Sequence, residues 1–277
     1  MDKDTNQLIT AIKECLDRDI SAYDQAFLWK ALNSALSRTG FRRVDDYCSY
    51  IKKNSYEAEK LYTSLHITFS QFFRDPLTFA ILEQSVIPRI ISNKTADHKI
   101  RIWSAGCSYG QEPYSIAMLL MDFAENSGIE VPFQIFATDI SEEALASARA
   151  GVYNESTVQE IKLRQLNKYF TRQGKHYIIS PQLKQYISFS NYDLLDVSTA
   201  NPPESIYGDF DIVFCCNLLI YYRFDSQKYI IKKLRQALSD TGYIVTGEAE
   251  KSLLVKSGQL QMLETPSTVF KYNKGRW

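Results

Sequence analysis

The chain has 277 residues, 45% of them hydrophobic, which is enough for one large domain or two smaller ones with a buried core. Its 32 Lys and Arg residues equal its 32 Asp and Glu residues in number, so no overall field favours nucleic acid as a partner. Five cysteines form no CxxC pair, and only three histidines are present, which excludes the usual zinc spacings and a disulfide framework.

The N-terminal residues MDKDTNQLIT are polar and acidic, without the apolar core of a secretory signal. No run in the sequence approaches the ~18 apolar residues that cross a bilayer. We therefore expect a soluble, cytoplasmic protein that holds no metal and is not inserted in a membrane.

The first ninety or so residues carry helical patterns only. Apolar residues recur at helical spacing over 8–16 and 27–36, and Gly40 stands where a C-terminal helix cap is expected. Shorter helical patterns follow around Tyr47 and Leu61. This part of the sequence predicts a small helical module.

Asp75-Pro76 is typical of a helix start, with the aspartate as N-cap and proline in the first turn. The pattern predicts a connecting helix that runs to about Ile91. We therefore expect an all-helical domain over 1–91 and a linker in the polar stretch 92–99.

From residue 100 onward, short apolar runs alternate with amphipathic helical patterns. The predicted strands cover 100–104, 133–138, 187–190, 210–215, 242–246 and 268–272, and the predicted helices cover about 111–126, 142–150 and 226–238. This alternation predicts an α/β domain over 100–277, with a mostly parallel sheet covered on both faces. Such sheets bind ligands beyond the carboxyl ends of their strands.

The alternation is interrupted between about residues 151 and 189. A helical pattern over 158–169 is followed by two short strand patterns, 177–179 and 186–189, and Gly174 stands among polar neighbours, which together indicate a hairpin. We expect a small inserted subdomain there, and inserts that leave the central sheet intact often serve in binding.

The segment SAGCSYG (104–110) lies between the first predicted strand and its helix. Its glycine spacing is GxxxG, which is neither the dinucleotide-binding GxGxxG nor a phosphate-binding P-loop. Gly106 would let the backbone approach a ligand closely, although two glycines in such a turn also serve tight packing. Both readings stay open at this point, but a phosphate ligand and an NAD-dependent oxidoreductase are disfavoured.

Asp139 ends the second predicted strand, beside the glycine turn. An acid there can accept hydrogen bonds from both ribose hydroxyls. Its alternative role is to cap the helix over 142–150, but Ser141 can serve as that cap. The turn and the acid together favour an adenosine-type ligand without phosphates, a description that S-adenosylmethionine fits.

Five segments carry a family resemblance: FFRDP (72–76), IWSAGCSYGQEPYSIAMLL (102–120), FATDIS (136–141), SARAGVY (147–153) and FDIVFCCNLLIYY (210–222). In this order they resemble the signature blocks of the CheR-type chemotaxis receptor methyltransferases, and the resemblance runs from about residue 5 to 272. It implies a helical N-terminal domain followed by a class I, Rossmann-like methyltransferase domain with a small inserted β-subdomain.

The resemblance also implies an activity. The cofactor would be S-adenosylmethionine, the co-product S-adenosylhomocysteine, and the product a glutamyl methyl ester on the cytoplasmic helical bundle of a chemotaxis receptor. Two further readings stay open: methylation of another signalling protein, or a non-catalytic sensor or adaptor that binds the cofactor or its demethylated product. A monomer is expected.

Residue roles follow position by position from the same resemblance. Asp139 would bind the ribose, Arg74 would lie close to the cofactor and the reacting centre, and Tyr221 would lie beside the methyl group. Asp193 and Leu194 match the pair that brackets the adenine. The other positions matched to cofactor binding are Thr68, Ser70, Gly106, Gln111, Cys216 and Asn217.

Two features depart from the family pattern. Cys216 occupies a position where relatives usually carry arginine, and a thiol supplies neither that charge nor its five donors. The departure keeps the sensor reading open. The predicted hairpin loop TRQGK (171–175) is short, with one glycine, whereas relatives that dock first on a receptor's C-terminal tail have a longer, glycine-rich loop. We therefore expect that tail docking is not required.

Overall fold

A computed structural model describes residues 2–93, 99–256, 260–263 and 266–272, so positions 94–98 of the expected linker lie outside the described residues. The chain divides into two compact units. The first comprises Met1–Ile67 and Leu218–Ile230, and the second comprises Thr68–Asn217 and Ile231–Trp277. The first unit ends at Ile67 and not near residue 91, and it includes residues 218–230, which were expected in the C-terminal domain.

Four helices of the first unit match the helical patterns of the sequence: α1 (Asp2–Leu16), α2 (Gln25–Thr39), α3 (Val44–Ile51) and α4 (Ser55–Ser64). The apolar positions of these helices, such as Leu8 and Leu28, are fully buried. Gly40 ends α2 as predicted, because its left-handed φ of 81° lets its N–H return to the Leu36 carbonyl.

An ion pair between an exposed arginine and a buried carboxylate joins three of these helices. The Arg38 guanidinium of α2 donates to both carboxylate oxygens of Glu57 on α4, at 2.6 and 3.1 Å. The Tyr47 hydroxyl of α3 donates to the same carboxylate at 3.1 Å. Because Glu57 is only 6% exposed, the three donors replace the water that the charge loses on burial.

The first unit also takes in a segment expected in the methyltransferase domain. It contains the 3-10 helix η3 (Leu219–Tyr221) and the first turns of α11 (Phe224–Ala237). The Asp24 N–H donates to the Tyr221 carbonyl at 2.8 Å, and the rings of Tyr23 and Tyr222 stack with their centroids 5.1 Å apart.

The helix predicted to follow Asp75 forms, but it packs in the second unit. It consists of α5 (Pro76–Ile81), a π-helical turn η1 (Leu82–Val86) and α6 (Ile87–Ser92). Leu82 and Ile87 are buried in the same hydrophobic cluster as Ile102 of the sheet. Pro88 lacks an N–H and would clash with the carbonyl four residues earlier in a regular helix. A π turn just before it relieves that conflict.

Among the described residues, seven strands form the main sheet in the order β6-β2-β1-β7-β8-β10-β9. Their bounds are β1 (Ile100–Ala105), β2 (Phe133–Asp139), β6 (Ile187–Asn191), β7 (Phe210–Cys215), β8 (Leu238–Thr246), β9 (Leu260–Met262) and β10 (Val269–Tyr272). The first five in spatial order pair in parallel, whereas β10 is antiparallel to both of its neighbours. The predicted α/β class is confirmed, and within this sheet β9 is a strand that the sequence did not predict.

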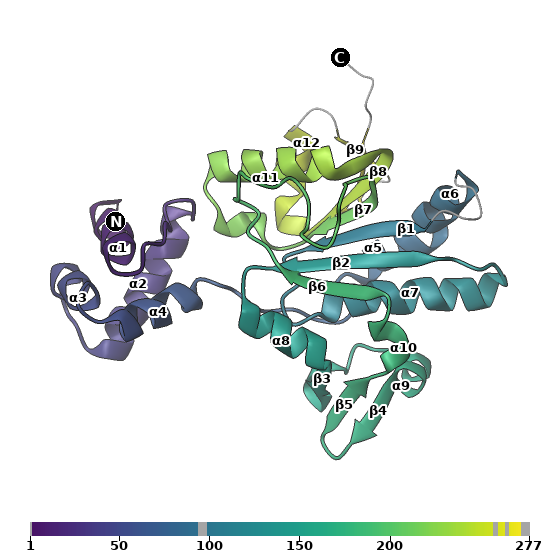
Figure 1. Cartoon of the computed structure of the whole chain (residues 1–277), viewed down its shortest axis with the longest axis horizontal. Coiled ribbons are helices and arrows are strands. Elements are labelled where there is room, and N and C mark those ends of the chain that lie inside the picture. Colours follow the sequence, from purple (N-terminus) through teal and green to yellow (C-terminus); the bar gives the residue numbers. More distant parts are fainter. Residues whose placement is uncertain (1, 94–98, 257–259, 264–265, 273–277) are drawn as a thin grey trace. The chain divides into compact units, whose positions relative to one another are not determined.

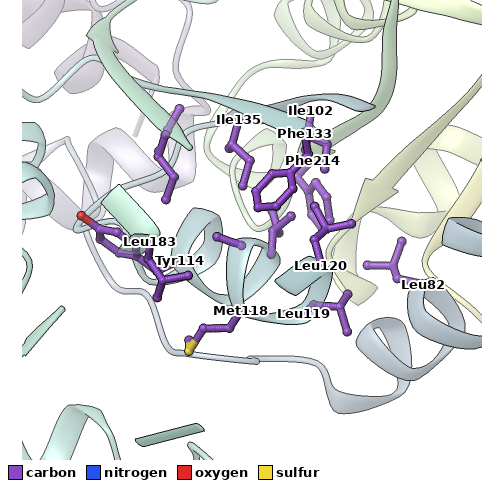
Figure 2. Packing of buried hydrophobic residues seen from close by; sticks show 14 of the residues in the cluster. Leu82, Ile102, Tyr114, Met118, Leu119, Leu120, Phe133, Ile135, Leu183 and Phe214 are labelled. Atoms are coloured by element: carbon purple, nitrogen blue, oxygen red, sulfur yellow. The ribbon is translucent and has the colours of Figure 1, made fainter. Parts of the chain in front are cut away.

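Helices cover the sheet on its two faces, with α7 (Gln111–Ser127) and α8 (Glu142–Ala150) on one face and α11 and α12 (Lys251–Lys256) on the other (Figure 1). Figure 2 shows strand residues such as Ile135 and Phe214 packed with Met118 and Leu120 of α7. At ~25 cal/mol per Å² of apolar surface, this burial dominates the stability of the unit.

The insert is built on the segment that follows α8, all of which is described. Its strands β3 (Val152–Asn154), β4 (Phe170–Gln173) and β5 (His176–Ile179) form a sheet in the order β3-β5-β4. The strand expected over 177–179 forms β5, but it pairs with β4 across a turn at Gly174, whose φ is +60°, and not with residues 186–189. The helical pattern over 158–169 gives a shorter helix, α9 (Leu163–Tyr169), and α10 (Pro181–Lys184) follows β5.

The expected end of the insert, near residue 189, is corrected by the strand pairing. Ile187 to Asn191 form β6, which pairs in parallel with β2 as the edge of the main sheet. The subdomain therefore ends before Ile187. Contacts of α9 hold the insert on α7, because Tyr169, Gln165 and Lys168 all donate to the Asp122 carboxylate at 2.7 to 3.0 Å.

Within the described ranges, no helix is both long enough and apolar enough to cross a membrane. The same ranges contain no group of three or more His, Cys, Asp or Glu side chains arranged to hold a metal ion.

Candidate active site

The glycine turn after β1 lies at the carboxyl edge of the sheet. Gly106 has a φ of +81°, and its N–H donates to the Thr138 carbonyl of β2 at 2.8 Å. Gly110 precedes α7 with a φ of +86°, and a Cβ there would lie 2.9 Å from the Cβ of Ala148. Gly110 therefore serves helix packing, whereas Gly106 shapes the turn where a ligand would approach.

Asp139 at the end of β2 is bonded to this turn. One carboxylate oxygen accepts the Ser108 N–H at 2.8 Å, and the other accepts the Ser141 N–H at 2.9 Å. Ser141 caps α8 through its own side chain, which accepts the Ala144 N–H at 3.2 Å, as predicted. Backbone N–H groups of the turn thus orient the Asp139 carboxylate, a group that can also accept hydrogen bonds from hydroxyls.

Gln111 opens α7 directly after the turn. It is 4% exposed, and its Oε1 has no hydrogen-bond partner among the described residues. A buried polar atom left without a partner costs about 1–3 kcal/mol, so an atom of this kind at a sheet's carboxyl edge indicates a ligand that donates to it. The observation supports the placement of Gln111 among the cofactor-binding residues.

The FFR segment is fixed on α7 next to Gln111. The Phe73 N–H donates to Ser115 Oγ at 3.0 Å, and Ser115 Oγ donates to the Gln111 carbonyl at 2.7 Å. The link holds Phe73 at a φ of +48°, a strained conformation for an aromatic residue. It sets the position of the next residue, Arg74.

Arg74 is exposed, and its guanidinium lies 5.2 Å from the centroid of the Phe69 ring. No carboxylate of the described residues forms an ion pair with it. Asp75, the alternative partner weighed for Arg74, instead caps α5 by accepting the Thr78 N–H and hydroxyl. Among the described residues Arg74 therefore forms no ion pair, and its charge acts on a protein carboxylate, that of Glu112, only through the longer-range electrostatic interaction.

Thr68 and Ser70 precede this segment. The Thr68 hydroxyl donates to the Tyr109 hydroxyl at 3.2 Å, and the Thr68 carbonyl accepts the Ser108 hydroxyl at 2.7 Å. Thr68 is thus brought to the glycine turn, as predicted. Ser70 is half-buried between Phe69 and the FFR segment.

Asp193 and Leu194 follow β6 on the same edge of the sheet. The Tyr192 N–H donates to the Asp139 carbonyl at 3.0 Å, which brings the two strand ends together. Asp193 is exposed and accepts the Leu195 N–H at 2.8 Å, whereas Leu194 is 6% exposed. One polar and one apolar side chain therefore stand next to the ribose-binding candidate.

Asn217 follows β7 and is held by the loop after β8. Its φ is +58°, and its N–H donates to Glu250 Oε2 at 2.7 Å. The same oxygen accepts the Gly247 N–H at 3.0 Å and the Thr246 hydroxyl at 3.1 Å. A Cβ on Gly247 would lie 2.7 Å from Asn217 Nδ2, so only glycine permits this approach.

Cys216 contacts a residue that the sequence did not single out, Glu112. The Glu112 carboxylate accepts the Ser104 hydroxyl at 2.7 Å and a hydrogen bond from the Cys216 thiol. Burial raises the pKa of Glu112 to about 7; the two hydrogen bonds oppose the rise, Glu250 adds to it and Arg74 opposes it. Burial likewise raises the pKa of the Cys216 thiol well above its usual value, so this thiol is neutral at pH 7.

Glu112, at the start of α7, and Glu250, in the 3-10 helix Glu248–Glu250 after β8, interact electrostatically, and both also interact with the neutral Cys216 thiol. The sequence feature that could have identified Glu112 as a site residue is its place as an acid in the first turn of α7, one position after Gln111. Local periodicity does not tell which of two neighbours faces β7, so the sequence did not identify it.

Tyr221 is the predicted site residue that belongs to the first unit. It ends η3, and its ring lies 4.9 Å from that of Phe27, centroid to centroid. The ten cofactor-binding positions predicted from the sequence belong to the second unit. The role of Tyr221 stays a prediction.

The edge residues fit S-adenosylmethionine. An acid beside a glycine turn suits a ribose, the unpartnered Gln111 oxygen suits a donor group, and the Glu112–Glu250 pair suits a cation. The turn itself carries no lysine or arginine between Gly106 and Gly110, which agrees with a ligand that lacks phosphate.

Comparison with known proteins gives the family. The family model described as "CheR methyltransferase, SAM binding domain" matches residues 68–269. A chemotaxis protein methyltransferase of Borreliella burgdorferi is 27% identical over 88% of this chain and 87% of its own length. A probable biofilm formation methyltransferase, WspC of Pseudomonas aeruginosa, is 29% identical over 94% of this chain and 60% of its own length.

An uncharacterized 104.1 kDa protein of Rhodobacter capsulatus is 32% identical over 79% of this chain. The match covers 23% of that protein's length, so the same module also occurs within a much longer chain. The family model spans the whole carboxyl edge of the sheet, from Thr68 through Glu250. The chain described here belongs to the CheR methyltransferase family and is an S-adenosylmethionine-dependent methyltransferase.

Proposed function

We propose that this chain transfers a methyl group to glutamate side chains on the cytoplasmic helical bundle of chemotaxis receptors, forming glutamyl methyl esters. One observation carries the proposal: the segment matched by the CheR methyltransferase model contains every residue predicted to bind the cofactor. Similarity to proteins named chemotaxis protein methyltransferases supports the choice of acceptor.

The acceptor chemistry requires little from the protein beyond position. A glutamate carboxylate has a reference pKa of about 4.3 and is ionised at pH 7, so the nucleophile needs no general base. The cofactor supplies an electrophilic methyl group on a sulfonium. Holding carboxylate and methyl group in line can supply roughly 7–11 kcal/mol of the barrier reduction.

Arg74 is the residue we assign to acceptor orientation. Its guanidinium is exposed and has no protein carboxylate partner among the described residues, which suits it to receive an incoming one. A tight bidentate pair would weaken the nucleophile, so the role is orientation rather than activation. Tyr221 is proposed to align the methyl face.

The cofactor would be held by several elements at once. Asp139 would accept the ribose hydroxyls, Asp193 and Leu194 would bracket the adenine, and Gln111 would accept from a donor of the cofactor. Glu112 joins this set on structural grounds, because an acid next to Glu250 favours a cationic ligand. The other proposed cofactor contacts are Thr68, Ser70, Gly106, Cys216 and Asn217.

We further propose that the enzyme acts in the cytoplasm as a monomer and does not require a receptor tail. The β4–β5 hairpin supports the last point, because its turn at Gly174 leaves no long loop between the strands. Pulling down receptor with and without its C-terminal tail tests it. Binding that depends strongly on the tail would overturn it.

The central experiment is incubation of the protein with methyl-tritiated cofactor and the cytoplasmic domains of candidate receptors. Base-labile, volatile methanol released from the labelled receptor would identify glutamyl esters. Label that resists alkali would show methylation of another side chain, and label on no receptor would exclude this acceptor class. Receptors with glutamate replaced by aspartate at the labelled positions give the matched control.

An acceptor in a different signalling system is the second candidate, favoured by the similarity to a probable biofilm formation methyltransferase. Labelling of a receptor-like protein outside chemotaxis, with chemoreceptors unlabelled, would select it. The non-catalytic sensor that Cys216 suggested in the sequence disagrees with membership of a methyltransferase family, and the labelling experiment tests it as well. Cofactor binding without label transfer to any acceptor would favour that reading.

A further inference from the structure

Lys233 on α11 is a lysine buried to 4% exposure. Its ammonium donates to the Tyr192 hydroxyl at 3.1 Å and to the Asp196 carbonyl. It also lies 5.1 Å from the centroid of the Tyr192 ring. Lysine is almost never fully buried unless it is paired, so a buried ammonium that bonds to one loop at two points indicates a specific structural role.

The two points that Lys233 bonds are the ends of a short loop. Between Tyr192 and Asp196 stand Asp193, Leu194 and Leu195. Inside the loop, the Leu195 N–H donates to the Asp193 carboxylate at 2.8 Å, and the Asp196 N–H donates to the Asp193 carbonyl at 3.0 Å. The single ammonium therefore closes a loop that is already a compact turn.

Tyr192 connects this loop to the rest of the site. Its N–H donates to the Asp139 carbonyl at 3.0 Å. Its ring meets that of Trp103 edge to face at 5.9 Å, and Trp103 Nε1 donates to the Thr138 hydroxyl of β2 at 2.9 Å. The loop is thus held between the end of β2 and the Lys233 ammonium.

We propose that Lys233 is a positioning residue for cofactor binding, which fixes the loop that presents Asp193 and Leu194 at the carboxyl edge of the sheet. It acts through Tyr192 and the Asp196 carbonyl and does not contact the cofactor. The inference rests on the proposed adenine-bracketing role of Asp193 and Leu194. It adds a residue on another element, about forty positions later in the chain, to the determinants of cofactor affinity.

The test is calorimetric titration of S-adenosylhomocysteine and S-adenosylmethionine into wild type, Lys233→Met and Lys232→Met. Lys232 is exposed on the same helix and gives the matched loss of charge. Removing the charged donor should weaken binding roughly tenfold in Lys233→Met and leave Lys232→Met unchanged. In turnover assays, KM for the cofactor should rise while kcat at saturating cofactor stays the same.

A double-mutant cycle separates positioning from general destabilisation. If Lys233 acts through Leu194, the losses of affinity in Lys233→Met and Leu194→Ala are not additive, because contacts within one unit couple. Additive losses, or unchanged affinity in Lys233→Met, would overturn the inference. If Lys233→Met does not fold, Tyr192→Phe removes the hydroxyl that accepts from Lys233, together with its bond to the Thr199 carbonyl at 3.0 Å, and should weaken binding in the same direction. Unchanged affinity there overturns the inference equally. Absence of binding by wild type would instead refute the proposed cofactor site.

Discussion

Replacing Glu112 by glutamine should stabilise the protein in alkaline solution and leave its stability nearly unchanged in acid. The carboxyl group accepts hydrogen bonds from Ser104 and Cys216, and a glutamine carbonyl can accept the Ser104 bond in the same place. The substitution therefore removes the ionisable group while it keeps the local shape and the principal hydrogen bond.

The magnitude follows from proton linkage. Burial raises the pKa of Glu112 from 4.5 to about 7, so between these values the folded state binds a proton that the unfolded state has released. Stability due to this group is fully present below pH 4.5 and is lost as the pH rises towards 7. At about 1.4 kcal/mol per pKa unit, the wild type loses roughly 3 kcal/mol by pH 8.5.

Glu112→Gln avoids this loss, so its melting temperature should exceed that of wild type by several degrees at pH 8.5 and by little at pH 4.5. A gain of 1 kcal/mol raises the melting temperature of a domain of this size by about 2–4 °C. Calorimetric melts at the two pH values, at equal ionic strength, measure the difference. Exposed Glu143→Gln on α8 is the matched control and should shift neither melt.

Two results would refute the reasoning. A Glu112→Gln variant that is less stable than wild type at pH 8.5 would mean that the ionised carboxylate is well paired in the folded state. An equal shift at both pH values would mean that the effect is one of packing and not of charge. The same variant should bind the cationic cofactor more weakly at pH 8.5, because the substitution removes one negative charge from the acidic pair.

Further substitutions test the other parts of the molecule. Asp139→Ala should weaken cofactor binding by about 1–3 kcal/mol through loss of a charged acceptor, which titration calorimetry measures against Glu143→Gln; unchanged affinity would remove Asp139 from the site. Arg74→Ala should reduce turnover more than cofactor affinity, and normal turnover would remove Arg74 from the mechanism. Glu57→Gln should destabilise the first unit by roughly 1–2 kcal/mol at pH 7, because the buried carboxylate loses its charged hydrogen bonds from Arg38, which is itself exposed. These bonds hold the pKa of Glu57 below its usual value, so the deficit should shrink as the pH falls from about 4.5 through the lower pKa of the folded state. Denaturant melts at pH 7 and at about pH 2.5 measure the deficit, and a deficit of equal size at the lower pH would contradict this reasoning.

Most of the fold was predictable because its elements are marked locally. The helix caps at Gly40, Asp75 and Ser141 each form the bond that the sequence predicts. The strands with continuous apolar runs also form where expected, since their burial on both faces leaves a clear signal. Asp139 was identifiable because a strand end and a glycine turn stand next to each other in an α/β pattern.

The features that escaped prediction depend on contacts between distant positions. The segment 218–230 joins the N-terminal helices through pairing of Tyr222 with Tyr23, and no local pattern records that pairing. The β9 strand is three residues long and gains its identity only from pairing with β10. Glu112 was missed for the same reason, because the Cys216 thiol with which it interacts lies just after β7, about a hundred positions later.

The charge pattern around Cys216 bears on whether the thiol argues against catalysis. An arginine at that position would add a positive charge near Glu112, whereas the neutral Cys216 thiol adds none. A cationic cofactor would then restore the balance itself, and its neutral demethylated product would restore less of it. Cysteine at this position therefore favours binding of the charged cofactor over binding of its neutral product. It does not alter the residues that would meet the acceptor. Because Arg74 belongs to a different segment and meets no protein carboxylate of its own among the described residues, the distinction between enzyme and sensor depends on Arg74 and its acceptor, and not on Cys216.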